Sequence, residues 1–313
     1  MLPQILRRLV ATIPVMGVVA IAVFALLHLT PGDPAVIIAG DYATSEDIVR
    51  IRAKLGLDRP FLTQVGIWLG QIVRGDLGTS IFSGLPVSTL MGQRAEATIA
   101  LTLFALLISV CVGVPLGVIA AWKEGSWIDR VVMIAAVSGF SMPVFWLGFL
   151  LVYVFAISFS WLPVQGYVSF KTGLAPFLRH LILPALTLSV VYLALIARMT
   201  RASMLGVLKE DYVRTAFAKG LAPRRVLIRH ALKNASLPVV TIIGIGFALL
   251  IGGAVVTESV FALPGLGRLT VDAIIRRDYP VIQGVVLVVS GVYVLINLVI
   301  DVLYVVLDPR IRY

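Results

Sequence analysis

The chain has 313 residues, of which 59% are hydrophobic and 13% are charged; its net charge is +10 and its mean hydropathy is +1.02. A soluble domain uses roughly 25% charged residues, so this composition excludes an ordinary soluble protein. It predicts an all-α membrane protein, and we expect one transmembrane domain over residues 1–313 because no stretch resembles a separate globular domain.

Six apolar runs are long enough to span a membrane, since a transmembrane helix needs roughly 20 residues. They cover residues 9–29, 97–122, 128–159, 181–199, 237–257 and 281–307. The first run is too long for the apolar part of a signal peptide and has no clear cleavage site after it, so we expect it to be retained. Six spans place both termini on the same side of the membrane.

The positive charge is distributed unequally between the two predicted sides. The side with both termini carries 15 Lys and Arg residues against 5 acidic residues, whereas the other side carries 11 against 10. Because basic loops remain in the cytoplasm, the termini should be cytoplasmic. The same distribution explains the net charge as a topology signal, so we expect contact with membrane lipid and no nucleic-acid partner.

Two outer segments separate the spans. In residues 30–96, Thr44 and Asp47 form a capping-box pattern before a short helix that ends at Gly56. A second amphipathic helix is predicted over Phe61–Arg74. These helices either lie over the outer mouth of the protein or only cap the bundle. The last outer segment begins at Glu258 and turns at Pro264-Gly265. The candidate residues for an outer contact surface on this segment are Glu258, Phe261, Pro264 and Gly265.

The cytoplasmic segment 204–233 is long and charged, unlike most connections between helices. Residues 210–219 predict a helix whose apolar side carries the i,i+4 pairs Tyr212/Ala216 and Val213/Phe217. Gly220 suits a left-handed helix stop, and Pro223 suits the first turn of a second helix. The segment therefore predicts a helix–glycine–helix projection with an apolar contact surrounded by basic residues.

Two interpretations of this projection remain. Basic residues near a membrane are attracted to anionic lipid by roughly 1 kcal/mol each, but lipid attraction requires neither a Gly–Pro break nor an apolar side. Docking of a soluble partner explains both features and is favoured. The candidate contact residues are Asp211, Tyr212, Arg214, Thr215, Ala216, Phe217, Lys219, Gly220, Arg224, Arg225 and His230.

The third apolar run contains a proline, which removes a backbone hydrogen bond and kinks a helix. Such breaks persist in membranes where protein or water satisfies the freed groups. The break therefore indicates either the wall of a translocation pathway or a kink that serves packing alone. The candidate pathway residues are Ser138, Ser141, Pro143, Phe145 and Trp146.

The sequence also restricts the chemistry of the chain. No Gly-Lys pair occurs, so a phosphate-binding loop for ATP cannot form. Cys111 is the only cysteine and the three histidines are far apart, so we expect no metal site and no cofactor bound by this chain. The motifs Gly-x-Ser-x-Gly and His-Glu-x-x-His are absent as well, which argues against an intramembrane hydrolase.

Several segments resemble the permeases of ATP-binding-cassette (ABC) importers in the dipeptide, oligopeptide, glutathione and nickel family. The stretch 211–221 is similar to the coupling loop of these permeases, with Thr215, Ala216 and Gly220 at the matching positions. Arg214 stands where the generic motif has a glutamate, and Lys233 stands where the generic motif has a proline. The other similar segments are 28–35, 55–60, 75–80, 230–238, 256–267 and 308–312, so the resemblance covers the whole chain.

This resemblance implies the fold of a type I ABC importer transmembrane domain, of the first-permease type, in a bacterial inner membrane. It implies three kinds of partner: a related second permease, two cytoplasmic ATPase subunits or domains that carry ATP and Mg²⁺, and a periplasmic or lipoprotein substrate-binding protein. The last outer segment would face the binding protein through Glu258, Phe261, Pro264 and Gly265. The chain would form half of a path for peptides, or for nickel or another small solute.

An ion-coupled secondary transporter is the alternative from another class. It requires a buried ionisable relay, because acids inside a membrane are usually functional. Asp301 with Asn297 is the only clear candidate, and Asp301 lies within about two helical turns of the cytoplasmic end of its run. This alternative leaves the projection at 204–233 unexplained.

Overall fold

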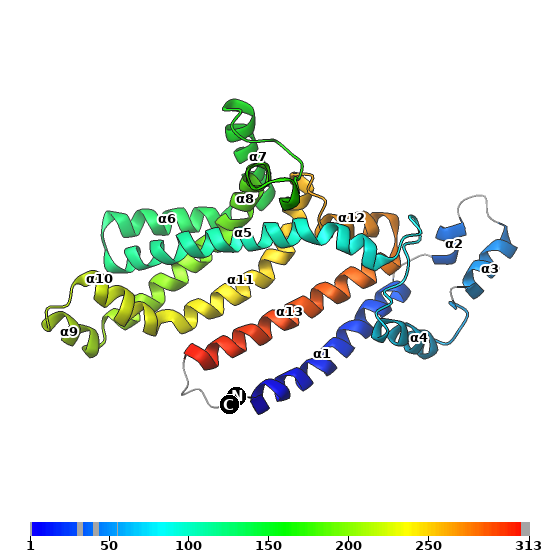
Figure 1. Cartoon of the computed structure of the whole chain (residues 1–313), viewed down its shortest axis with the longest axis horizontal. Coiled ribbons are helices and arrows are strands. Elements are labelled where there is room, and N and C mark those ends of the chain that lie inside the picture. Colours follow the sequence, from blue (N-terminus) through cyan, green and yellow to red (C-terminus); the bar gives the residue numbers. More distant parts are fainter. Residues whose placement is uncertain (1, 30–33, 40–43, 55, 308–313) are drawn as a thin grey trace. The chain divides into compact units, whose positions relative to one another are not determined.

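The computed structural model describes residues 2–29, 34–39, 44–54 and 56–307, and the part it describes is helical without strands (Figure 1). Lipid offers no partners for backbone polar groups, so a spanning segment has to satisfy them within a helix. The helices are α1 (Leu2–Leu29), α2 (Pro34–Ala39), α3 (Ser45–Lys54), α4 (Phe61–Val73), α5 (Val87–Trp122), α6 (Trp127–Ser141), α7 (Val144–Leu151), α8 (Leu174–Leu208), α9 (Asp211–Ala218), α10 (Pro223–Arg225), α11 (Lys233–Val260), α12 (Leu266–Arg276) and α13 (Tyr279–Leu307).

Three further segments are helical with other hydrogen-bond spacings. Residues Val152–Ser158 continue α7 as a π-helix, and Val226–Leu232 join α10 to α11 in the same way. Phe170–Thr172 form one 3-10 turn before α8. Helical structure therefore runs without interruption from Pro223 to Val260, so the predicted second helix of the cytoplasmic projection is the start of the predicted fifth span.

Within the described residues, four helical segments are long and apolar enough to cross a membrane: Val87–Trp122, Leu174–Leu208, Pro223–Val260 and Tyr279–Val302. The pair formed by α6 and α7 with its π-helical continuation makes a fifth crossing if it counts as one broken span. The described apolar part of α1, Val10–Ala25, is shorter than a full span. The span boundaries and the count of six therefore stay predictions.

The third apolar run is bent at the proline where the sequence predicts a kink, and a single span over 128–159 stays a prediction. The two halves of the run are bent by 107° relative to each other. Met142 and Pro143 are both extended, with ψ of 132° and 133°. Proline disfavours the helical region for the residue before it, so the Met142-Pro143 pair ends α6 and lets α7 begin in a new direction.

The chain divides into two compact units. One consists of Met1–Ala95 and Leu269–Leu295, and the other of Glu96–Arg268 and Ile296–Tyr313. In the first unit, α4 packs on α1 through aromatic rings: Phe24 lies with its centroid 5.7 Å from that of Phe61 and 5.2 Å from that of Trp68. This contact confirms an apolar side on the predicted helix 61–74. Three predictions lie outside what the structure describes. The predicted capping box needs the side chain of Asp47, which is not described. Segment 28–35 is described only in part, and segment 308–312 is not described at all.

The second unit is a bundle in which α8 packs against α6, α7 and α11 (Figure 1). Glycines permit close approaches between helices of this unit. A Cβ at Gly117 on α5 would lie 2.6 Å from the carbonyl oxygen of Ala197 on α8, and a Cβ at Gly253 on α11 would lie 2.9 Å from Leu188 Cδ1. The core of this unit includes Leu101, Leu183, Leu188, Leu250, Phe261 and Leu263.

The connection between α11 and α12 is fastened by a buried carboxylate. Glu258 accepts a hydrogen bond from Thr98 Oγ1 of α5 at 2.5 Å and one from the backbone N–H of Arg268 at 2.9 Å. Thr98 Oγ1 in turn accepts from the N–H of Leu266 at 2.7 Å. Both accepting groups satisfy N–H groups in the first turn of α12, where a negative charge is favoured by the helix dipole.

This arrangement corrects the expectation that Glu258 and Phe261 belong to an outer surface. Both side chains are buried, with 0% and 1% exposed, because the carboxylate caps α12 and the ring packs into the core. Of the four candidates on this segment, Pro264 alone is exposed. Gly265 is buried, and a Cβ there would overlap the carboxylate of Glu258.

Replacing Gly265 by alanine should therefore destabilise the protein. The added Cβ would displace the buried Glu258 carboxylate, and overpacking of this kind costs about 1–3 kcal/mol. Gly70→Ala is the matched control, because Gly70 is exposed on α4 and a Cβ there has no atom within 4 Å. Thermal unfolding of the detergent-solubilised protein, followed by tryptophan fluorescence, should show a lower Tm for Gly265→Ala alone. Equal Tm values for the two variants would contradict the role given to Glu258.

Candidate docking hairpin

The candidate site is the helix–glycine–helix projection predicted to be cytoplasmic, which we call the coupling hairpin and define as residues 211–232. Its first arm, α9, begins directly after α8: Lys209 ends α8, and the N–H of Val213 donates to the Glu210 carbonyl oxygen at 3.0 Å. Asp211 lies in the first turn of α9, where its charge is favourable to the helix dipole. The observed bounds, Asp211–Ala218, confirm the predicted helix.

The turn of the hairpin is a Schellman motif. The N–H of Gly220 donates to the carbonyl oxygen of Phe217 at 2.9 Å, and the N–H of Leu221 donates to that of Ala216 at 3.4 Å. Gly220 has φ of +76°, a conformation that side chains with a Cβ rarely adopt. Pro223 then opens the second arm. The stop and the start predicted from Gly220 and Pro223 are both confirmed.

The arms meet through a small buried cluster. Val213 and Ala216 of α9 pack against Val226 of the second arm, and Val207, Leu208 and Leu221 surround them. The aromatic members of the predicted apolar side lie elsewhere: Tyr212 is 42% exposed and Phe217 is 43% exposed. The single apolar side predicted for α9 is therefore wrong. Val213 and Ala216 hold the two arms of the hairpin together, whereas Tyr212 and Phe217 are exposed.

Exposed basic residues lie near the two exposed aromatic residues in the sequence of the hairpin. Arg214 forms only a solvent-exposed ion pair with Asp211 at 3.6 Å, which contributes little to stability. Tyr212 is oriented by Asn234, whose Nδ2 donates to its hydroxyl oxygen at 2.8 Å. His230 is half-buried, and the exposed basic residues of the hairpin are Arg214, Lys219, Arg224, Arg225 and Arg229.

The hairpin is tied to the bundle by a second apolar cluster. Leu227 and Ala231 of the second arm pack against Met204 of α8 and Ala121 at the end of α5. All four side chains are buried. A displacement of the hairpin therefore has to move the ends of both helices, because packed side chains leave no room for independent movement.

Close to this cluster in the sequence, an ion pair joins α6 to α8. Arg201 donates to both carboxylate oxygens of Asp129, from Nε at 2.6 Å and from Nη2 at 2.7 Å. Asp129 also accepts from the N–H of Gly125 at 3.0 Å, which fixes the turn between α5 and α6. The Asp129 side chain is 6% exposed and that of Arg201 is 25% exposed. Sequence reasoning missed this pair, because nothing in the separation of residues 129 and 201 marks them as neighbours.

The five candidate pathway residues lie close together in the sequence around the bend between α6 and α7. Ser138, Ser141, Pro143, Phe145 and Trp146 are all exposed, while Gly139 and Gly148 turn inward against Val190 and Thr187. The Ser141 hydroxyl donates to the carbonyl oxygen of Val137 at 2.9 Å. The bend thus presents polar and aromatic side chains on the outside of the isolated chain.

Comparison with known proteins identifies the family. Residues 113–313 match the family described as binding-protein-dependent transport system inner membrane component, and residues 1–102 match the N-terminal family of the same membrane components. The chain belongs to the binding-protein-dependent transport permeases. The permease is accordingly a multi-pass protein of an inner membrane and a transport subunit of an ABC importer, and this family is not an enzyme family.

Relatives of this permease align over its full length. A probable peptide ABC transporter permease protein of Sinorhizobium fredii is 55% identical over 309 residues, covering 99% of both chains. A glutathione transport system permease protein of Salmonella choleraesuis is 45% identical and a dipeptide transport system permease protein of Alkalihalophilus pseudofirmus is 42% identical, each covering 100% of both chains. These matches confirm the resemblance to the first-permease type.

The fold is also similar to that of a solved importer. A chain of the inward-facing MetNI methionine ABC transporter superposes with a TM-score of 0.59 at 19% identity, covering 71% of this chain and 97% of that chain. At this identity the likeness concerns the fold alone, and it confirms the predicted type I importer architecture. In the part of the permease that the structure describes, no three His, Cys, Asp or Glu side chains gather as a metal site would require.

Arg201→Gln should destabilise the permease by about 3 kcal/mol, because it leaves the Asp129 carboxylate buried without its partner. Adding Asp129→Asn should restore part of this loss, since the double variant contains no uncompensated charge. Arg198→Gln, which removes an exposed charge from the same helix, is the control. Denaturation in detergent of both single variants, the double variant and the control tests the interaction, and additive effects of the two substitutions would show that the pair does not couple α6 to α8.

Proposed function

We propose that this permease forms half of the path by which short peptides cross the inner membrane, and that the coupling hairpin docks on a separate ATPase subunit. The peptide assignment is supported by the relatives described as peptide, dipeptide and glutathione permeases. Glutathione is itself a small peptide, so the three descriptions share one substrate chemistry. Nickel and other small solutes remain the alternative substrates within the same family.

The docking role rests on one observation: two aromatic side chains are exposed on a helix whose other side is buried. An exposed aromatic residue with basic neighbours is the kind of group that dominates the energy of protein interfaces. Tyr212 is held by Asn234 and loses little freedom on binding. A lipid-facing role explains the basic residues but not an oriented tyrosine next to a rigid Schellman turn.

A partner also has to complete the pathway. The candidate residues at the bend between α6 and α7 lie open on the chain, so a second, related permease would supply the opposite wall. Two cytoplasmic ATPase subunits or domains would bind ATP and Mg²⁺, and a periplasmic or lipoprotein binding protein would deliver the peptide. Hydrolysis would then alternate the pair of permeases between outward-open and inward-open states.

Membership of the binding-protein-dependent family argues against the ion-coupled alternative. That alternative required Asp301 to act as a proton relay. Asp301 is half-buried and has an interaction partner of its own. A structural role is therefore sufficient to explain an acidic residue at this position.

Phe217→Ala should weaken association with the ATPase subunits while leaving the hairpin folded, because Phe217 does not belong to the buried cluster of the hairpin. Loss of an exposed aromatic anchor costs about 2 kcal/mol at an interface, or roughly a thirtyfold lower affinity. Phe170→Ala removes a similarly exposed ring on the predicted opposite side and serves as the control. Affinity measured with purified ATPase subunits should fall for Phe217→Ala alone, and an unchanged affinity would show that the hairpin does not dock there.

The predicted orientation can be checked by labelling introduced cysteines with a membrane-impermeant maleimide. In a Cys111→Ala background, Lys171→Cys should react from the periplasm and Lys219→Cys only from the cytoplasm, since both positions are exposed and lie on opposite predicted sides. Labelling of both positions in intact spheroplasts would overturn the predicted topology.

A further inference from the structure

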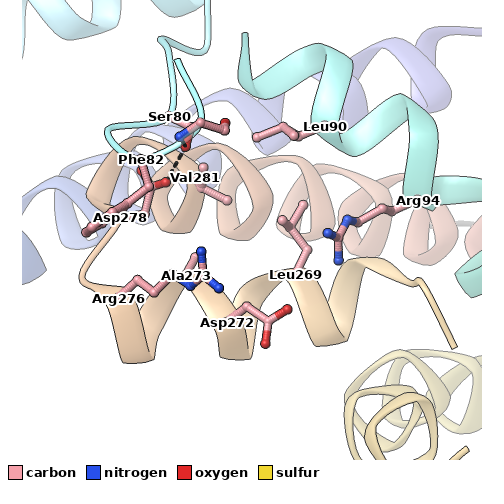
Figure 2. Close-up of a pocket in the computed structure, with 11 residues that line it drawn as sticks. Ser80, Phe82, Leu90, Arg94, Leu269, Asp272, Ala273, Arg276, Asp278 and Val281 are labelled. Atoms are coloured by element: carbon pink, nitrogen blue, oxygen red, sulfur yellow. Dashed lines mark hydrogen bonds between the residues drawn. The ribbon is translucent and has the colours of Figure 1, made fainter. Parts of the chain in front are cut away.

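The first unit contains a cavity of about 200 Å³ that the proposed docking and pathway roles leave unused (Figure 2). It is bordered by the loop that follows α4, the start of α5, the helix α12 and the start of α13. By the predicted topology, all of these segments lie on the periplasmic side. The side chains that line it include Phe82, Leu90, Arg94, Leu269, Asp272 and Arg276.

One wall of the cavity is fixed by hydrogen bonds. The Ser80 hydroxyl donates to Asp278 Oδ2 at 2.5 Å, and the N–H of Ile81 donates to Asp278 Oδ1 at 3.1 Å. The loop also closes on itself, with the N–H of Ser80 donating to the carbonyl oxygen of Leu85 at 2.9 Å. The negative charge of Asp278 is thus engaged by the loop, and the wall is formed before any ligand arrives.

Three other charged side chains line the same cavity. In the described part of the chain, Arg94, Asp272 and Arg276 form no hydrogen bond or ion pair through their side chains. Figure 2 shows Arg94 of α5 and Arg276 of α12 extending toward the middle of the view from opposite sides, with Leu269 between them and Asp272 one turn before Arg276 on α12. The cavity is therefore lined by two guanidinium groups and one carboxylate together with apolar side chains.

The charges and the size together select a ligand. A guanidinium group binds a carboxylate through two parallel hydrogen bonds, and the carboxylate of Asp272 complements an ammonium group. An inorganic anion would use the arginines but would be repelled by Asp272. A zwitterion with a carboxylate and an amino group uses all three side chains, and the volume suits a molecule of about two amino-acid residues.

We propose that this cavity binds a short peptide with free termini, its carboxylate on Arg94 and Arg276 and its amino group on Asp272. The proposal rests on the proposed function, and it adds a site on the outer side where the permease itself contacts its substrate. Phe82, Leu90 and Leu269 contact the apolar parts of the bound peptide.

The test measures binding of three small probes to the purified importer complex without its binding protein: dialanine, N-acetyl-dialanine and dialanine amide. Arg94→Gln or Arg276→Gln should weaken dialanine and N-acetyl-dialanine about tenfold, because each loses a charge-assisted contact with the carboxylate. These variants should leave dialanine amide unchanged. Asp272→Asn should weaken dialanine and dialanine amide but not N-acetyl-dialanine. Arg74→Gln, an exposed arginine outside the cavity, is the control and should leave all three affinities unchanged.

Three outcomes would overturn the proposal: no binding of dialanine at millimolar concentration, equal probe affinities in all variants, or, in a parallel measurement with the binding protein added, variants that lose affinity only for that protein. The last result would make the cavity a docking point for an acidic side chain of that protein. Peptide uptake into proteoliposomes by the unsubstituted complex separates the two proposals. Uptake without binding in the cavity would refute the cavity alone, whereas no peptide uptake with saturating binding protein would refute the proposed substrate class.

Discussion

Hydrogen bonding of the backbone in lipid is the constraint on which this architecture depends. A spanning segment without internal hydrogen bonds would leave polar groups unsatisfied in hydrocarbon, so the chain is a series of helices. Some of these helices are much longer than the bilayer: α5 and α8 have 36 and 35 residues. At about 1.5 Å per residue, each is longer than the roughly 30 Å hydrocarbon core. The long helices therefore carry apolar packing beyond the membrane, where the coupling hairpin attaches.

Inside this frame, a few buried polar groups fix the connections between helices. Glu258 and Thr98 satisfy the first N–H groups of α12, and Asp129 joins Arg201 with the turn before α6. A buried carboxylate is stable only where hydrogen bonds replace its hydration. These contacts therefore specify where helices meet, while apolar packing supplies most of the stability. The polar contacts and the apolar packing are both suited to a transporter, because together they allow connected helices to move as one group.

The coupling hairpin separates structural and interacting side chains on one short helix. Val213 and Ala216 close the hairpin, whereas Tyr212 and Phe217 remain exposed. The sequence pattern could not separate these roles, since all four residues are apolar or aromatic and fit one helical side at i,i+4 spacing. Only the direction of the second arm decides which pair is covered. The same limit applied to Glu258 and Phe261, whose place beside a Pro-Gly turn suggested a surface although both are buried.

By itself, the sequence determined the membrane class, the helical fold, the importer family and the local signals at Gly220 and Pro223. The family was implied by the resemblance of short motifs, and the other features depend on composition, on the length of apolar runs and on backbone preferences, all of which are local. The sequence predicted a break at Pro143, but tertiary structure alone decided its angle of 107°, the pairing of Asp129 with Arg201, and the cavity shared by Arg94, Asp272 and Arg276. Each of these depends on the direction of a helix or on residues far apart in the chain, and no local pattern carries that information.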